Sequence, residues 1–255
     1  MTLEISAIKT IGSQLIAILG LSAPAVGVRL LPADSEVPEN VERLNGYRYC
    51  QALMAARHGR AVVLDSQGIS CPAAAAAFGF RPLPKNLANG KALVGFGIVA
   101  DEAVGRRMFE TMVTLRPGRI QQLQLFPLDQ AMEVPDVVVI EDQVEKLMWL
   151  NLAYLHVTGG ERILSSTAVL QATCVDSTII PYVECRLNFS YGCYGFRDAT
   201  NIDGSETVVG FPATLLPAMM EHLEYLNQKA IPTSRAKKAL ASLRKRAQRA
   251  DEIEA

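Results

Sequence analysis

The sequence predicts a mixed α+β protein of the α/β type, in which two related halves pack as one unit and a charged helix follows them. Segments with apolar residues at helical spacing alternate with short β-branched runs. Of the 255 residues, 49% are apolar and 20% are charged, which is typical of a globular protein with a substantial core. The sequence contains a repeat of about a hundred residues, which is longer than the units of a solenoid and so predicts two related halves. We therefore expect one domain over residues 1–232, with halves at about 20–126 and 127–232, and a terminal helix over 233–255.

The first half is predicted from its helix boundaries and its β-branched runs. Apolar residues recur at helical spacing over residues 3–19, and Gly20 is placed to end that helix. Pro72 suits the first position of a helix that Cys71 would cap, and Asp101 suits the cap of a later one. The full prediction for this half is strands at 25–31, 61–64, 94–98 and 120–126, and helices at 47–57, from 72 onward and at 101–112.

The second half is predicted to contain three strands. Val137 to Ile140 is a β-branched run, residues 184–191 alternate as a strand does, and residues 207–211 are expected to return as their partner. Trp149 lies on an apolar helix between the first two. The terminal segment mixes basic and acidic residues, which predicts a solvated helix or a contact between copies of the chain.

The repeat is seen in the order of short motifs. Each half has a strand, a helix that ends near a histidine, a cysteine and a Val-Gly-Phe triplet. The matched pairs are Pro24–Val28 with Pro135–Val139, His58 with His156, Cys71 with Cys174, and Val94–Phe96 with Val209–Phe211. The second half has extra residues between its cysteine and its triplet, and these contain the segment Gly192-Cys193-Tyr194-Gly195-Phe196-Arg197. Glycines on both sides of Cys193 permit a tight bend in which backbone can approach a metal or ligand closely.

Five short segments carry a resemblance to a known family. They are Pro24-Ala25-Val26-Gly27-Val28-Arg29, Tyr49-Cys50-Gln51-Ala52, Ile69-Ser70-Cys71-Pro72, Pro135-Asp136-Val137-Val138-Val139 and the Gly192 to Arg197 segment. In their order the chain resembles domain-of-unknown-function family 169 over nearly its whole length. The resemblance implies a shared fold unit and no assigned activity.

Four of the five cysteines are the main candidates for a site. Cys50, Cys71 and Cys193 lie in the family-like segments. Cys174 is placed by the internal repeat as much as by the family resemblance. Four thiolates are the donor set of an iron–sulfur cluster, or alternatively of a structural zinc ion. No Cys-x-x-Cys motif is present, so the fold itself would have to bring the four together. Cys185 falls within the predicted strand 184–191 and is expected to be a core thiol.

Two other classes of function stay open. Arg29 and Arg197, with Gly192 and Gly195 beside the second, could bind a carboxylate or phosphate of a small molecule without any metal, together with the helix N-termini expected at Cys71 and Cys174. Alternatively, Cys71 could act as a nucleophile or redox group with His58 or His156 as its base. No phosphate loop, dinucleotide fingerprint or His-Glu-x-x-His motif is present.

Charge and cysteine usage indicate the setting in which the protein works. The net charge of −1 provides no long-range field for nucleic acid or an anionic membrane. The longest uncharged run, residues 10–28, is interrupted by Gln14, glycines and Pro24, so we expect neither a membrane span nor a signal peptide. An odd number of cysteines favours free thiols in the reducing cytoplasm. The expected partners are a small molecule or a redox protein, and a homodimer is compatible with the terminal helix.

Overall fold

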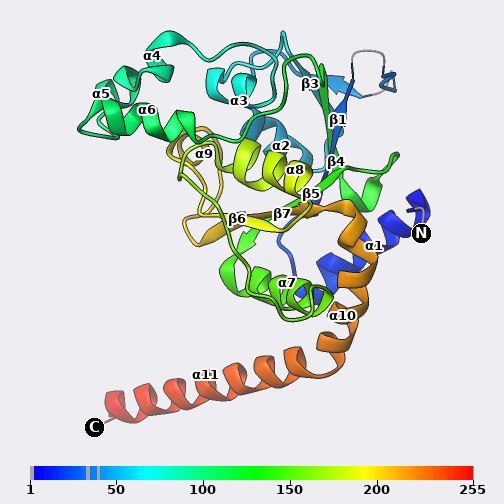
Figure 1. The fold of residues 1–255 in the computed structure, drawn as a ribbon. Coiled ribbons are helices and arrows are strands. Elements are labelled where there is room, and N and C mark those ends of the chain that lie inside the picture. The colour runs from blue at the N-terminus through cyan, green and yellow to red at the C-terminus, as the bar shows by residue number, and fades with distance from the viewer. Residues whose placement is uncertain (1–2, 33–34, 39–40, 255) are drawn as a thin grey trace.

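A seven-stranded mixed sheet forms the centre of the molecule (Figure 1). The computed structural model describes residues 3–32, 35–38 and 41–254, and for residues 244–254 it describes the backbone alone. The strands run in the order β2-β3-β4-β1-β5-β7-β6. Every neighbouring pair is antiparallel except β2 and β3. Their bounds are β1 (Val26–Leu31), β2 (Glu42–Arg43), β3 (Val62–Asp65), β4 (Gln122–Pro127), β5 (Val137–Gln143), β6 (Asn188–Ser190) and β7 (Glu206–Pro212).

Helices cover both faces of this sheet, which confirms the mixed α+β class (Figure 1). One face packs on α2 (Tyr49–Arg57), α3 (Pro72–Ala77), a π-helix (Ala172–Ile179) and α8 (Ile180–Glu184). The other packs on α1 (Ile5–Leu19), α7 (Val144–Val157) and α10 (Leu216–Gln228). Because β5 and β7 are covered on both sides, they are continuous buried runs and not alternating strands.

The helix boundaries predicted for the first half are confirmed. Helix α1 ends at Gly20, whose φ of +66° is the left-handed conformation that glycine adopts at low cost. Cys71 is the N-cap of α3 and Pro72 its first residue. The carboxylate of Asp101 accepts hydrogen bonds from the backbone N–H groups of Ala103 and Val104 at the start of α6 (Glu102–Glu110).

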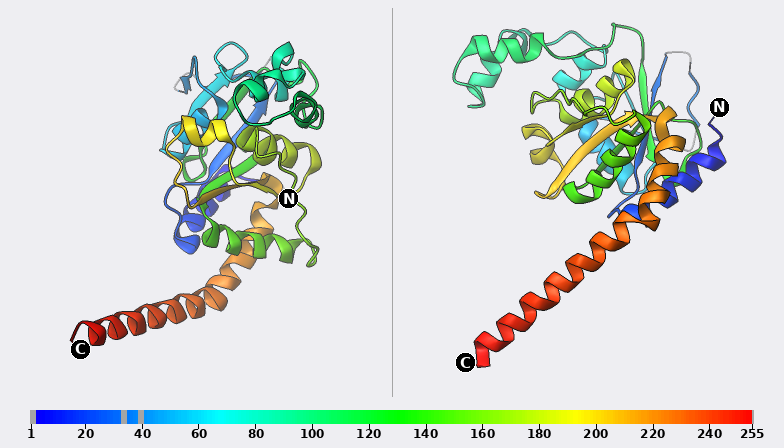
Figure 2. Two further views of the ribbon diagram at one scale, coloured as in Figure 1. Left: turned by 90° about the vertical axis from the view of Figure 1, so that its left-hand side faces the viewer. Right: turned by 60° about the horizontal axis from the view of Figure 1, so that its bottom comes forward.

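The predicted strand at 94–98 is wrong, because these residues belong to a helical lobe beside the sheet (Figures 1 and 2). The lobe consists of α4 (Lys85–Ala88), α5 (Lys91–Gly95) and α6. Its small core is formed by Leu87, Leu93, Phe109 and Leu170. Packing within the helical lobe determines the conformation of residues 94–98, because no strand in the described part of the chain lies alongside them.

The sequence repeat of two halves is not confirmed. Val94–Phe96 lies at the end of α5, whereas Val209–Phe211 lies inside β7, so the matched triplets have different structures. Strands β1 and β5 are neighbours, with Gly27 opposite Val138, but three strands lie beyond β1 and two beyond β5. The strand order therefore does not restore the correspondence that the motifs predicted.

The predicted strand at 184–191 is much shorter in the structure. Only Asn188–Ser190 pairs with β7, which confirms that residues 207–211 return as a partner strand. Glu184 ends α8, and Cys185 has a left-handed backbone with a φ of +52°. Cys185 is exposed, so its prediction as a core thiol is wrong.

A charged helix at the C-terminus is confirmed as α11 (Ala230–Glu254), which extends away from the sheet (Figures 1 and 2). Near its start, Arg235 donates to the carbonyl of Ile18 at 2.8 Å, and Lys238 pairs with Glu145. Among the described residues, no helix combines the length and the apolar character needed to cross a bilayer.

Candidate functional site

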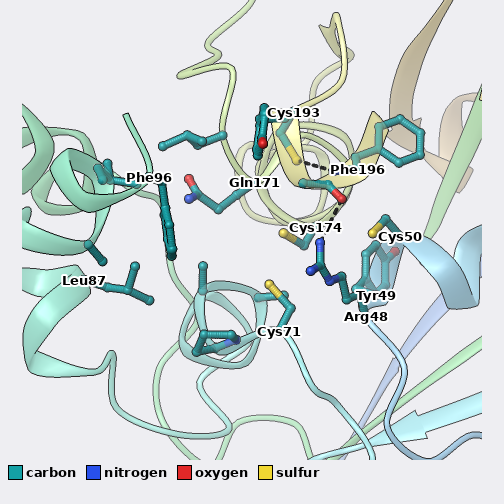
Figure 3. Close-up of a pocket in the computed structure, with 18 of the residues that line it drawn as sticks. Arg48, Tyr49, Cys50, Cys71, Leu87, Phe96, Gln171, Cys174, Cys193 and Phe196 are labelled. Carbon is teal, nitrogen blue, oxygen red and sulfur yellow. Dashed lines mark hydrogen bonds between the residues drawn. The ribbon is translucent and has the colours of Figure 1, made fainter. Parts of the chain in front are cut away.

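Four cysteines from four separate elements line one cavity of about 610 Å³, which we call the cysteine cavity (Figure 3). Cys50 is the second residue of α2, and Cys71 caps α3. Cys174 lies in the π-helix, and Cys193 caps α9 (Tyr194–Ala199). The four residues that the sequence predicts as one site are therefore brought together by the fold. The exposed Cys185 does not line this cavity.

The π-helix that carries Cys174 is held in place by its own hydroxyl groups and by the sheet. Ser177 and Thr178 each donate to a carbonyl five residues earlier, at 3.1 and 2.7 Å. The Thr178 hydroxyl also lies 2.8 Å from that of Tyr49, which links the π-helix to α2. Beneath it, a Cβ at Gly210 in β7 would lie 1.8 Å from the carbonyl oxygen of Ser177. Only glycine at position 210 lets the π-helix rest this closely on the sheet.

Cys193 sits in a turn that is fastened to α2. Its Sγ accepts a hydrogen bond from the Phe196 N–H at 3.3 Å, and Gly192 before it has a φ of +86°. Phe196 is fully buried in a cluster with Cys50 and Met54. The predicted role of Gly192 in forming a tight bend is thus confirmed as geometry, and the bend presents Cys193 to the same cavity as Cys50.

Among the described residues, Arg48 is the cationic side chain that lines the cysteine cavity, and it was not among the residues predicted from the sequence. Its Nη1 donates to the carbonyl of Gly195 at 3.0 Å, and a Cβ at Gly195 would lie 3.2 Å from that nitrogen. Figure 3 shows Arg48 in the wall of the cavity, next in sequence to Tyr49 and Cys50. The available signal was its position immediately before the Tyr49-Cys50 segment.

The two arginines predicted for an anion site do not line the cysteine cavity. Arg29 lies on β1, where it donates to Gln124 at 2.8 Å and has Glu133 at 3.8 Å. Arg197 donates to the backbone carbonyls of Tyr191, Asp203 and Glu206, so it holds the loop around β7 in shape. Of that predicted set, only Gly195 lines the cavity; Gly192 and Arg197 line an adjoining hollow.

Burial keeps two of the four thiols protonated near neutral pH. Desolvation raises the pKa of Cys50 to about 12, helped by Cys193 and Cys71, while Arg48 acts in the opposite direction. Burial raises the pKa of Cys174 well above its usual value, and the neighbouring Cys71 and Cys193 add to the shift. A metal bound here would therefore have to displace protons from both thiols.

The cysteine cavity contains the sulfur atoms of a thiolate metal site, but these atoms are not arranged around a single ion. Among the side chains that the structure describes, no group of three or more His, Cys, Asp or Glu residues is arranged to hold a single metal ion. A structural zinc site needs its ligands tetrahedrally around one point. The zinc alternative therefore does not fit the cysteine cavity as it stands.

Neither histidine proposed as a base lies beside Cys71. His58 follows α2 and lines a separate hollow with Met54 and Arg60. His156 stacks on His222 with ring centroids 3.8 Å apart. No histidine in the described part of the chain lines the cysteine cavity, so the geometry offers no Cys–His pair there.

Comparisons with known proteins identify a family and nothing more specific. Neither the search of curated proteins nor the search of solved structures found a match to this chain. The family described as uncharacterised ArCR matches residues 14–222, which include all four cysteines of the cavity and Arg48. The chain therefore belongs to domain-of-unknown-function family 169.

Proposed function

We propose that the cysteine cavity binds an iron–sulfur cluster through Cys50, Cys71, Cys174 and Cys193, for a redox or cofactor-handling role. One observation supports this most directly: four of the five cysteines, far apart in sequence, line the same cavity. Buried thiols are ordinarily inert core residues. These four instead line one open space, and Cys71 and Cys193 are only partly buried. The fifth, Cys185, is exposed and lies elsewhere.

A cluster suits this arrangement better than a single ion does. In a four-iron cluster each iron atom takes one thiolate, and in a two-iron cluster each takes two, so the four sulfurs need not surround one point. The remaining wall of the cavity is largely apolar, with Leu87, Leu93 and Phe109 among its residues. Apolar surroundings limit the access of water, which tunes the potential of such a centre.

Arg48 would offset part of the negative charge that four thiolates bring. It is the one arginine that lines the cavity among the described residues, and it already lowers the pKa of Cys50 against the effect of burial. A fixed cation beside the sulfurs favours their charged form and would raise the reduction potential of a bound centre.

A bound cluster would supply one-electron chemistry, and the residues of the chain would hold it and limit its contact with water. Two protons leave Cys50 and Cys174 when their thiolates form, because both pKa values are raised. The cytoplasm, where thiols stay reduced, and a small-molecule or redox partner belong to the same proposal.

The test is the iron and acid-labile sulfide content of protein purified without oxygen and after reconstitution. Cys50→Ala, Cys71→Ala, Cys174→Ala and Cys193→Ala should each lower the content sharply. Cys185→Ala is the matched control and should leave it unchanged, because Cys185 is exposed and outside the cavity. A reconstituted wild type without iron, or equal iron in all five variants, would refute the proposal.

A further inference from the structure

The cysteine cavity has two walls of different character (Figure 3). One carries the four thiols, and the other is built by the helical lobe from Leu87, Leu93, Phe96 and Phe109. Its volume of about 610 Å³ lies within the range of roughly 300–1,000 Å³ that is usual for small-molecule sites. A cluster bound at the thiols would leave the lobe wall uncovered.

Two exposed aromatic side chains stand at this cavity. Phe96, just after α5, is 67% exposed, and Tyr194, the first residue of α9, is 66% exposed. Both also line an adjoining hollow of about 530 Å³, together with Leu170 and Cys193. Large aromatic groups gain little when they face water, whereas they stack well on a flat ring. Because the cavity and the hollow share these lining residues, the open space continues from the thiols to the part of the lobe that carries Phe96.

One polar side chain from the segment before the π-helix points into this space. The amide of Gln171 is directed toward Phe96 and makes no hydrogen bond with the other residues drawn in Figure 3. The backbone of Gln171 is left-handed, with a φ of +56°, and so is that of Val169. Such conformations in non-glycine residues are uncommon and cluster at ligand sites. A single amide in an apolar cavity can orient a ligand through both donor and acceptor atoms.

We propose that the lobe side of the cysteine cavity binds a planar, mostly apolar organic molecule with one hydrogen-bonding edge. Its flat ring lies against Phe96 and Tyr194, and its polar edge meets the amide of Gln171. The binding uses the lobe wall and not the sulfur atoms. It therefore stands whether or not a cluster is present.

The experiment uses metal-free wild-type protein and the neutral fluorescent probe N-phenyl-1-naphthylamine, whose emission rises in apolar surroundings. We expect saturable binding at one site. Phe96→Ala should weaken it by about tenfold, because a stacked aromatic contact is lost. Gln171→Gly, which also relieves the left-handed backbone, should weaken it by about fivefold. Ala92→Trp fills the cavity and should abolish it.

Leu164→Ala is the matched control, because Leu164 is 79% exposed and does not line the cavity. Circular dichroism establishes that each variant is folded. The proposal is overturned if the folded wild type binds no probe, or if Phe96→Ala and Ala92→Trp bind it as Leu164→Ala does. It is equally overturned if Phe96→Ala changes the oligomeric state and leaves probe affinity unaltered, since the aromatic pair would then be a contact between copies. Iron analysis plays no part, so the outcome is separate from that of the cluster proposal.

Discussion

Arg48 donates from Nη1 to the backbone carbonyl of Gly195 at 3.0 Å, and this bond fastens the start of α2 to the turn that carries Cys193. Since Cys50 lies two residues after Arg48, one contact sets the relative position of two candidate ligands. The same guanidinium lowers the pKa of Cys50 against the effect of burial. Arg48 thus has both a structural and an electrostatic part in the cavity.

Arg48→Met should loosen this connection while keeping most of the side-chain volume. A hydrogen bond from a charged donor contributes about 1.5–3 kcal/mol, and the half-buried position of Arg48 places the loss of unfolding free energy near the lower end. Urea denaturation measures it. The variant should also retain less iron after reconstitution.

Arg29→Met is the matched control for that change. Arg29 likewise donates a hydrogen bond from Nη1, in its case to the side chain of Gln124, but it lies on β1 outside the cysteine cavity. It should lower stability to a similar extent and leave iron binding unaltered. Equal iron content in the two variants would contradict the assigned role of Arg48.

Gly210→Ala should disturb the π-helix directly. The new Cβ would lie 1.8 Å from the Ser177 carbonyl oxygen, and backbone on both sides leaves little room to relax. We expect a loss of about 3 kcal/mol or more in unfolding free energy, at the upper end for overpacking. Gly204→Ala is the control, because nothing lies within 4 Å of a Cβ there. Equal denaturation midpoints for the two variants would contradict the requirement for glycine at 210.

The contrast between Cys193 and Phe96 shows what could be predicted from the sequence. Pro72 reveals the helix start at Cys71, and the paired glycines reveal the bend at Cys193. The set of four cysteines came from the family-like segments and the repeat, and the helix α9 after Cys193 was not predicted. The lobe wall was missed, because the β-branched run around Val94 favours a strand until the tertiary packing of Leu93 against Leu87 is known. Arg48 was passed over in favour of Arg29 for the same reason: only the fold decides which arginine faces a cavity.

Cys50 should react slowly with iodoacetamide in the metal-free protein at pH 8. Its pKa is raised from 9.0 to about 12, so its thiolate fraction is about a thousandfold lower than that of an unperturbed thiol. Each further pH unit should raise the rate about tenfold, which a purely steric block would not do. Peptide mapping by mass spectrometry gives the rate, with the exposed Cys185 as reference. Rapid labelling of Cys50 at pH 8 in folded protein would contradict the raised pKa.

Glu141→Gln should stabilise the protein at pH 8 and flatten its pH dependence. Glu141 lies on β5, fully in the interior, where neither carboxylate oxygen has a hydrogen-bond partner and Arg57 Nη1 is 3.6 Å away. That guanidinium is already engaged by both oxygens of Glu206, so it cannot fully neutralise a second carboxylate. Burial accordingly raises the pKa of Glu141 to about 8, with Arg57 opposing and Glu206 adding to the shift.

The sign of the pH effect follows from proton binding. A carboxyl whose pKa is higher in the folded chain than in the unfolded one binds more protons when folded, so stability falls as the pH rises from about 4.5 towards 8. In wild type the free energy of unfolding should therefore drop by a few kcal/mol over this window through this group alone, since each pKa unit corresponds to about 1.4 kcal/mol. The side-chain amide introduced by Glu141→Gln cannot ionise, so the variant should lose that slope and exceed wild type in stability at pH 8. The control Glu221→Gln, on the exposed surface of α10, should follow the wild-type curve. Parallel pH profiles for wild type and Glu141→Gln, measured by urea denaturation, would show that the pKa of Glu141 is the same in the folded and the unfolded chain.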